Sequence, residues 1–330
     1  MRAPFLRQCA GKGRIFSKND VREEMLSLAK KNQTMSRALQ RREDIAGYLF
    51  MLPSLIFFLG FVVIPMFICI GYSLTDATMH QQAATQIVGF SNFAKLLQDK
   101  VFIEALRNTF VIVIVSVPTV CAFSLWVASA IYKLSGPVLS AFRCIFYLPV
   151  VTGSVAVTVV WKWMFDNYTG IINTALKSAG LIEKNINFLG DSKYALWCII
   201  LILFTTSVGQ PIVLYVSALG NVDQTFIEAA QVDGATEFQV FWRIKWAQMM
   251  PTTLYILVIT TINSFQCFAL IQLLTQGGSG TQTVMYYIYY TAFKLTQQAG
   301  HFGYANAMGV VLAIFIGLLS ALQFKLAKEK

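Results

Sequence analysis

The segment from residue 227 to residue 244 reads Ile227-Glu228-Ala229-Ala230-Gln231-Val232-Asp233-Gly234-Ala235-Thr236-Glu237-Phe238-Gln239-Val240-Phe241-Trp242-Arg243-Ile244. It is amphipathic, carries charges of both signs and is far too polar to cross a bilayer, whereas the sequence on either side of it is strongly apolar. A membrane-embedded chain that keeps one helix-forming segment in water between two spans exposes that segment to soluble proteins. We therefore expect residues 227–244 to bind a soluble partner.

The composition indicates that lipid is the solvent for most of the chain. Hydrophobic residues make up 56% of the 330 residues and charged residues only 13%, against about 25% charged residues in a typical soluble protein. Six apolar stretches have the roughly 20 residues that a membrane-spanning helix needs: 45–74, 109–131, 138–161, 194–219, 252–274 and 304–324. Because these runs are continuous and do not alternate like β-barrel strands, the sequence predicts an all-α polytopic membrane protein with a six-helix transmembrane bundle.

The distribution of basic residues predicts the orientation in the membrane. Most of the 26 Lys and Arg residues flank one set of span ends, the set that includes residues 1–44, the segment 227–244 and the tail 326–330. Basic loops stay on the cytoplasmic side, so we expect both termini and this segment in the cytoplasm. The basic extension 1–44 fits either an interfacial amphipathic helix, from about Asp20 to Glu43, or a solvated tail. The net charge of +10 is spread along membrane-flanking loops, which does not indicate nucleic-acid binding.

The sequence lacks the motifs of an energy source, a pore or a catalytic centre. It has no GxxxxGK[ST] phosphate-binding loop, no TVGYG-like filter, no HExxH or GxSxG motif, and no Asp, Glu, Lys or Arg near the centre of a span. The six cysteines form no CxxC pair and only two histidines occur, so we expect no metal site. We also expect no catalytic residue and no cofactor bound by this chain. If the protein moves a solute uphill, another subunit supplies the energy.

Local chemistry predicts an interrupted helix in the polar segment. Thr225 is expected to cap the helix, with Glu228 three residues later at the spacing of a capping box. Gly234 can adopt a positive φ and turn the chain sharply. Apolar anchors follow the turn at Phe238, Phe241 and Trp242.

The residue order in this segment resembles the EAA motif of ABC importer permeases, in the form typical of the carbohydrate-uptake group. The similarity rests on Glu228-Ala229-Ala230, Asp233-Gly234-Ala235, Phe238 to Arg243, Ile244 and Pro251. Further similar stretches lie within residues 45–324: Tyr48 to Pro53, Val88 to Phe93, Phe102 to Thr109, Phe146 to Pro149, Trp161, Gly170 to Asn173, Gln276 to Gly278 and Phe302 to Ala305. The resemblance implies the type I importer permease fold over residues 45–325, with residues 225–243 as a coupling helix that inserts into a cleft on a cytoplasmic ATPase.

By this resemblance, six positions contact the ATPase: Glu228, Ala229, Ala230, Asp233, Gly234 and Ala235. The chain departs from the family where a Leu-Pro pair usually follows the position of Ile244, because Lys245, Trp246 and Ala247 stand there. We therefore expect the exit from the coupling helix to be less rigid or differently angled.

The family also implies the partners. They are a dimeric cytoplasmic ATPase that binds ATP and Mg, an extracytoplasmic sugar-binding protein, and a second homologous permease, with a homodimer as the alternative to a heterodimer. The implied location is the bacterial cytoplasmic membrane.

Polar breaks in the fourth and fifth spans are the candidate substrate site. The stretch from Phe268 to Gly278 resembles the larger permease of maltose-type transporters. That resemblance implies a sugar site at Thr205, Gly209, Ile212, Thr260, Ser264 and Cys267, with Gln210, Asn263 and Gln266 as polar neighbours. Side chains of these types supply the hydrogen bonds that a sugar needs. The alternative is that they form hydrogen bonds between helices.

We therefore expect a permease subunit of an ATP-driven importer for an oligosaccharide or related polyol, working by alternating access. One alternative is an ion-coupled secondary transporter that works without an ATPase. Another is a membrane assembly or sensory protein that uses an ATPase and transports nothing.

Overall fold

The computed structural model describes residues 43–78, 85–293 and 300–328. The expected amphipathic helix from Asp20 to Glu43 lies almost entirely outside these residues, as do residues 329 and 330 of the tail. The chain divides into two compact units, Met1–Ile68 and Cys69–Lys330, which are described in turn.

The first unit contributes most of one long helical run, Glu43–Ser73. A π-helical turn, η1 (Leu59–Val63), interrupts it before α3 (Ile64–Ser73). Pro65 has no N–H to donate to the carbonyl of Phe61, and a local widening of the helix accommodates that loss. The run is apolar on all sides, as expected of a helix that crosses lipid.

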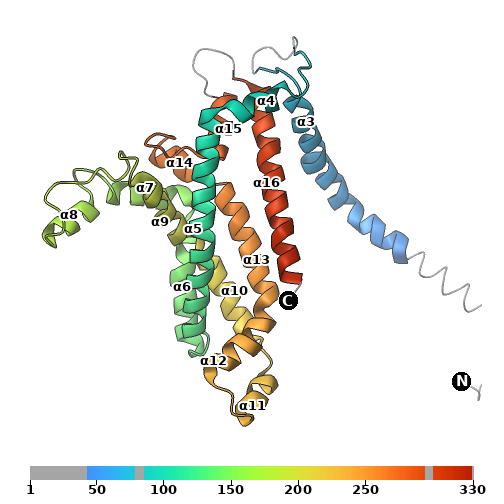
Figure 1. Ribbon diagram of the computed structural model, residues 1–330. Coiled ribbons are helices and arrows are strands. Elements are labelled where there is room, and N and C mark those ends of the chain that lie inside the picture. Colours follow the sequence, from blue (N-terminus) through green and yellow to red (C-terminus); the bar gives the residue numbers. More distant parts are fainter. Residues whose placement is uncertain (1–42, 79–84, 294–299, 329–330) are drawn as a thin grey trace, which may run out of the picture. The chain divides into compact units, whose positions relative to one another are not determined.

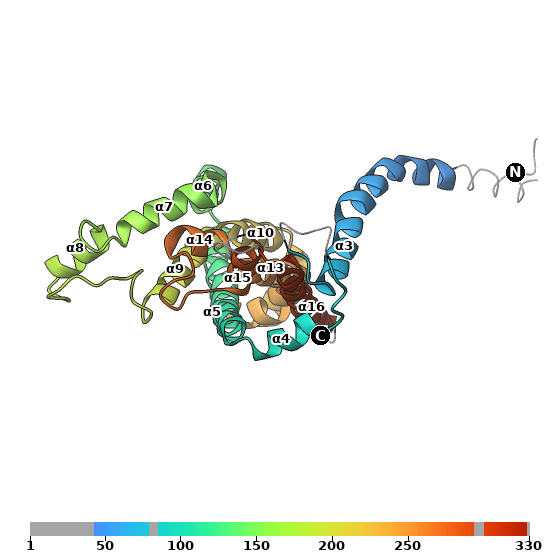
Figure 2. The same cartoon turned by 90° about the horizontal axis from the view of Figure 1, so that it is seen from above.

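The second unit is a helical bundle around α5 (Lys100–Ile131), which packs against α10 (Gly209–Gly220) and α13 (Trp246–Phe265). The C-terminal helix α16 (Phe302–Lys328) packs along α13. Figure 1 and Figure 2 show α5, α13 and α16 running side by side. Four described helical runs are long and apolar enough to cross a membrane, or up to six when each of two bent pairs is taken as one span.

The bent pairs fall on the third and fourth predicted spans. For the third, α6 (Gly136–Thr152) and α7 (Ser154–Met164) meet at 95°, so the expected single helix over 138–161 is corrected to two helices. Gly153 joins them with a φ of 85°, which a residue with a Cβ adopts only with strain. For the fourth, α9 (Ala195–Ser207) and α10 meet at 42°, at the polar break that the sequence indicates.

The fifth span also breaks where its polar residues predict. Helix α13 ends at Phe265, and a short helix, α14 (Ala269–Leu274), follows. The remaining described helices of the loops at this end of the bundle are α4 (Ser91–Gln98), α8 (Ile171–Ser178) and α15 (Val284–Phe293).

Three buried asparagines hold these loops. Asn92 Nδ2 donates to the carbonyls of residues 73 and 75, at 2.9 and 2.8 Å. Asn108 Nδ2 donates to Gly280 and Gln282 across the bundle, at 2.9 and 3.0 Å. Asn173 Nδ2 donates to carbonyls 166 and 186. Because a primary amide offers two N–H groups, each asparagine joins two carbonyls of a loop.

A single carboxylate joins three helices near the same end of the bundle. Asp99 caps α5 by accepting from the backbone N–H groups of residues 101 and 102. Its Oδ2 accepts from the hydroxyls of Tyr287 on α15 and Tyr304 on α16, at 2.8 and 2.7 Å. Burial raises the pKa of Asp99, but the hydrogen bonds from Tyr304, Tyr287 and the two backbone N–H groups outweigh it and leave the pKa below its ordinary value.

We expect Asp99→Asn to lower the thermal midpoint of the detergent-solubilised protein by about 2–4 °C, because a neutral amide oxygen is a weaker acceptor than a carboxylate. Since the folded-state pKa is lowered, the stabilisation by Asp99 is complete above about pH 4, the ordinary value, and is lost as pH falls through the folded-state pKa. The difference in thermal midpoint between wild type and variant should therefore become smaller as the pH is lowered below about 4. Glu104→Gln, an exposed carboxylate on the same helix, is the matched control. A pH-independent difference would contradict this account.

Candidate functional site

The polar segment folds as two short helices, α11 (Gln224–Val232) and α12 (Glu237–Val240). The expected cap at Thr225 is wrong, because Asp223 caps α11 and accepts from the backbone N–H and the hydroxyl of Thr225, at 2.9 and 2.8 Å. These bonds lower the pKa of Asp223. A capping box does exist, one helix later: Thr236 and Gln239 bond reciprocally at the start of α12. The Thr-x-x-Gln spacing at 236–239 was the signal for it.

Gly234 makes the turn between the two helices. Its φ is 79°, which confirms the predicted positive value. The N–H of Ala235 donates to the carbonyl of Ala230 at 2.9 Å, and the N–H of Gly234 donates to Gln231 at 3.1 Å. This pair of bonds is the Schellman motif, which ends a helix with a left-handed residue. The angle between α11 and α12 therefore depends on a glycine at position 234.

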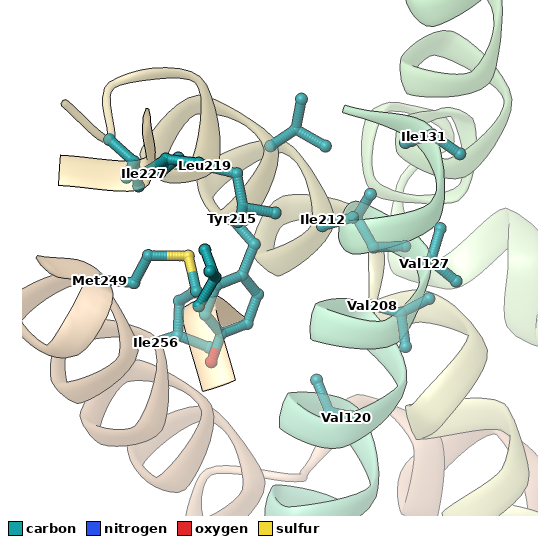
Figure 3. Packing of buried hydrophobic residues seen from close by; sticks show 14 residues of the cluster. Val120, Val127, Ile131, Val208, Ile212, Tyr215, Leu219, Ile227, Met249 and Ile256 are labelled. Carbon is teal, nitrogen blue, oxygen red and sulfur yellow. The ribbon is translucent and has the colours of Figure 1, made fainter. Parts of the chain in front are cut away.

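Two buried residues attach the segment to the bundle. Ile227 and Val240 belong to a core cluster with Tyr215 and Leu219 of α10 and Met249 of α13. Figure 3 shows Ile227 beside Leu219, with Met249 close to Tyr215. The segment is therefore packed on the bundle through one side only.

The opposite side of the segment is exposed and partly apolar. Phe226, Val232 and Phe238 have exposed fractions of 57%, 88% and 72%. Among the predicted coupling positions, Glu228, Ala229, Asp233 and Gly234 are exposed, while Ala230 and Ala235 are half-buried. Exposed aromatic and aliphatic side chains beside carboxylates form a surface suited to a protein partner.

The exit from the segment is continuous helix. A π-helical turn, η3 (Phe241–Lys245), carries α12 directly into α13, so the helix is continuous from Glu237 to Phe265. Trp242 and Trp246 pack across the turn with ring centroids 5.4 Å apart. Because Ala247 has the N–H that proline lacks, nothing in this stretch breaks the helix.

A pocket of about 150 Å³ lies between the fourth and fifth spans. It is lined by Val150, Thr206, Ser207, Gln210, Pro211, Leu214, Tyr255, Ile256, Ile259, Thr260 and Asn263. Three of the predicted substrate residues, Gln210, Thr260 and Asn263, are brought together here. The pocket offers hydroxyls, amides and the face of one exposed tyrosine, and none of its lining residues is acidic or basic. Such a lining suits a neutral, polyhydroxylated ligand.

The pocket also contains residues that sequence reasoning missed. Thr206 and Ser207 follow Thr205 directly, and Tyr255 lies two helical turns before Asn263 on α13. Positions eight residues apart on a helix share a face, so this spacing was a usable signal for Tyr255.

The other six predicted positions do not line this pocket. Thr205 is half-buried, and its hydroxyl donates to the Ile202 carbonyl of its own helix at 2.8 Å. Ile212, Ser264 and Cys267 are buried. Gln266 is exposed after the end of α13, and Gly209 is buried against α6.

Gly209 allows α10 to approach α6 closely. A Cβ there would collide with the carbonyl oxygen of Phe146 and would lie 3.1 Å from a methyl of Val150. We expect Gly209→Val to reduce the yield of folded, monodisperse protein several-fold, because overpacking against a backbone atom costs about 1–3 kcal/mol or more. Gly317→Val on α16 is the control, since a Cβ there meets nothing within 4 Å. Equal yields and melting midpoints in the two variants would contradict this prediction, because they would show that α6 shifts to accommodate the valine without loss of stability.

The described residues contain no group of three or more His, Cys, Asp and Glu side chains placed to hold a metal ion.

Burial raises the pKa of the Tyr286 phenol, with neighbouring tyrosines as a further cause. Tyr286 is buried, and Tyr287 is bonded to Asp99. These two tyrosines are therefore internal to the bundle.

Comparison with known proteins agrees with this architecture. Residues 45–328 match the family described as "Binding-protein-dependent transport system inner membrane component". YesP of Bacillus subtilis (strain 168), named a probable ABC transporter permease protein, is 33% identical over 291 residues, covering 86% of this chain and 91% of the relative. The lactose transport system permease protein LacF of Rhizobium radiobacter is 29% identical, covering 90% and 99%.

A solved structure is also similar. It is a chain of a bacterial ABC transporter involved in the import of the acidic polysaccharide alginate, with a TM-score of 0.71 and 25% identity, covering 87% of this chain and 96% of that chain. The chain therefore belongs to the family of inner membrane components of binding-protein-dependent transport systems, the permeases of ABC importers.

Proposed function

We propose that this permease carries a neutral oligosaccharide or a related polyol. The observation that carries the proposal is the pocket between α9, α10 and α13, which presents hydroxyls and amides around Tyr255 and contains no charged side chain. Hydrogen-bonding groups beside an aromatic face are what a sugar ring requires. Relatives named for lactose, for multiple sugars and for diacetylchitobiose transport support a saccharide cargo.

We further propose that the exposed side of α11 and α12 binds a dimeric ATPase in the cytoplasm. Phe226, Val232 and Phe238 form its apolar contacts, and Glu228 and Asp233 supply charge at its edge. ATP and Mg are bound by that partner. The excess of basic residues on the same side of the membrane supports a cytoplasmic location for this segment and for both termini.

The family supports the remaining partners of this proposal. A binding protein delivers the sugar to the loops at the opposite end of the bundle, as supported by a similar chain solved in complex with an alginate pentasaccharide-bound periplasmic protein. A second, homologous permease completes the path across the membrane. ATP binding closes the ATPase dimer and displaces α11 and α12, and the helical run from Glu237 transmits the displacement to Tyr255, Thr260 and Asn263.

Reconstitution tests the proposal. We expect proteoliposomes that contain the permease pair and its ATPase to accumulate one or more members of a panel of labelled di- to pentasaccharides, only with ATP and the loaded binding protein. Uptake driven by a proton or sodium gradient without the ATPase would instead establish the secondary-transporter alternative. An assembled complex that hydrolyses ATP and moves no sugar of the panel would contradict a saccharide cargo.

A further inference from the structure

One buried ammonium group, that of Lys245, joins the end of η3 to the end of α5. Lys245 is the last residue of η3 and is only 6% exposed. Its Nζ donates to the hydroxyl of Tyr132 at 3.0 Å and lies 5.4 Å from the centre of the same ring. Tyr132 is the C-cap residue of α5. The contact therefore ties the base of α13 to the end of α5.

The chemistry of this contact makes it specific. Removing a lysine ammonium from water is unfavourable unless its donors are satisfied. Here the hydroxyl of Tyr132 takes the place of a water molecule, through a hydrogen bond from the ammonium group. Tyr132 packs against an apolar cluster, and a hydrogen bond in apolar surroundings is stronger than one in water, so the hydroxyl of Tyr132 favours this position of Lys245.

The position of the contact relates it to transport. It lies directly after the coupling segment, at the π-helical turn where α12 becomes α13. Helix α13 carries five lining residues of the pocket, and α5 packs against both α10 and α13. Without a tie at this level, movement of α12 tilts the base of α13 along α5, and packing between the two helices absorbs it.

We propose that Lys245 is a positioning residue for coupled transport, which holds the end of α5 to the base of α13 so that displacement of α11 and α12 moves both helices together. The inference rests on the proposed docking of an ATPase at α11 and α12. It also accounts for the missing Leu-Pro pair: at the exit of the coupling segment this chain has a continuous helix and an ammonium tie in place of a proline.

The test uses the complete transporter in proteoliposomes and measures sugar uptake and ATP hydrolysis on the same samples. We expect Lys245→Met, which keeps the length and loses the charge, to reduce sugar moved per ATP about tenfold, with basal hydrolysis within twofold of wild type. Tyr132→Phe keeps the ring and removes the hydroxyl, and should reduce the ratio about threefold. Lys245→Arg, which keeps the charge, should retain at least half of the wild-type ratio of sugar moved per ATP hydrolysed. Lys133→Met is the control, since Lys133 is exposed and lies 5.8 Å from the same ring.

The outcomes separate this inference from the function on which it rests. Failure of the wild-type complex to import sugar would overturn the proposed function, whatever the variants do. If wild type transports and Lys245→Met has an unchanged ratio, the positioning role is wrong. If Lys245→Met does not assemble, Tyr132→Phe decides: a lower ratio in an intact complex supports the tie, and an unchanged ratio overturns it.

Discussion

Gly234→Pro should reduce ATP-driven uptake more than tenfold while the permease still inserts and folds. The left-handed φ of 79° at this position is closed to proline, whose ring fixes φ near −65°. Proline also removes the N–H that donates to Gln231. Both changes disrupt the turn, so α12 leaves α11 at a different angle and Phe238 is displaced from the docking surface. The bundle should tolerate the change because a side chain at Gly234 meets nothing within 4 Å.

Graded variants make this result specific to backbone conformation. Gly234→Ala should lower uptake by a smaller factor, because a left-handed alanine costs about 1–2 kcal/mol. Gly220→Ala is the control, since that exposed glycine has no positive φ and a Cβ there has open space. Glu228→Arg, which reverses a charge on the exposed side of α11, should also uncouple uptake from hydrolysis. Wild-type uptake in both Gly234→Pro and Glu228→Arg, with co-purification of the ATPase unchanged, would rule out docking through this segment.

Asn263→Leu should reduce the rate of sugar uptake about tenfold at saturating loaded binding protein. Asn263 is exposed on α13 and lines the pocket together with Gln210 and Tyr255. Loss of a buried hydrogen bond to a sugar hydroxyl, with the hydroxyl left unpaired, costs about 1–3 kcal/mol, and about 1.4 kcal/mol is a factor of ten. The effect belongs to the translocation step, because the variant leaves delivery by the binding protein untouched.

Gln266→Leu is the matched control for this prediction. It removes an exposed amide one turn farther along, outside the pocket lining. Uptake assays and basal ATP hydrolysis should be near wild type in that variant. Equal loss in both variants, or no loss in Asn263→Leu, would place the sugar elsewhere.

The sequence predicts the helices and the turn of the polar segment well, because both depend on local chemistry. Long apolar runs predict spans, and Gly234 predicts the left-handed turn. The 95° bend at Gly153 is harder to predict from the sequence, since a glycine in an apolar run is equally compatible with a straight helix. Thr225 is not the cap because the helix begins earlier: Asp223 is the N-cap, and its carboxylate accepts from the N–H of Thr225.

The lining of the pocket was harder to predict, because it depends on which face of a helix meets another helix. Gly209 and Ile212 lie on the same helix as Gln210, yet they pack against α6 and the core, while Gln210 is exposed. Gly209 is needed for close approach, and periodicity alone does not separate that role from substrate contact. Asp99 was missed for a related reason: its two tyrosine partners follow it by 188 and 205 residues.

The hydrogen bonds between Asn108 and a distant loop determine when, during synthesis of the chain, the bundle can complete its packing. Asn108 is held by carbonyls 172 and 174 residues later in the chain. At roughly 5–20 residues per second, the ribosome needs roughly 9 to 35 seconds to supply them. During that interval the side-chain amide of Asn108 has neither carbonyl. Helix α5 therefore reaches its final packing only after residue 282 has been made, and a ribosome that stalls before residue 280 leaves an incomplete bundle in which Asn108 lacks both carbonyls.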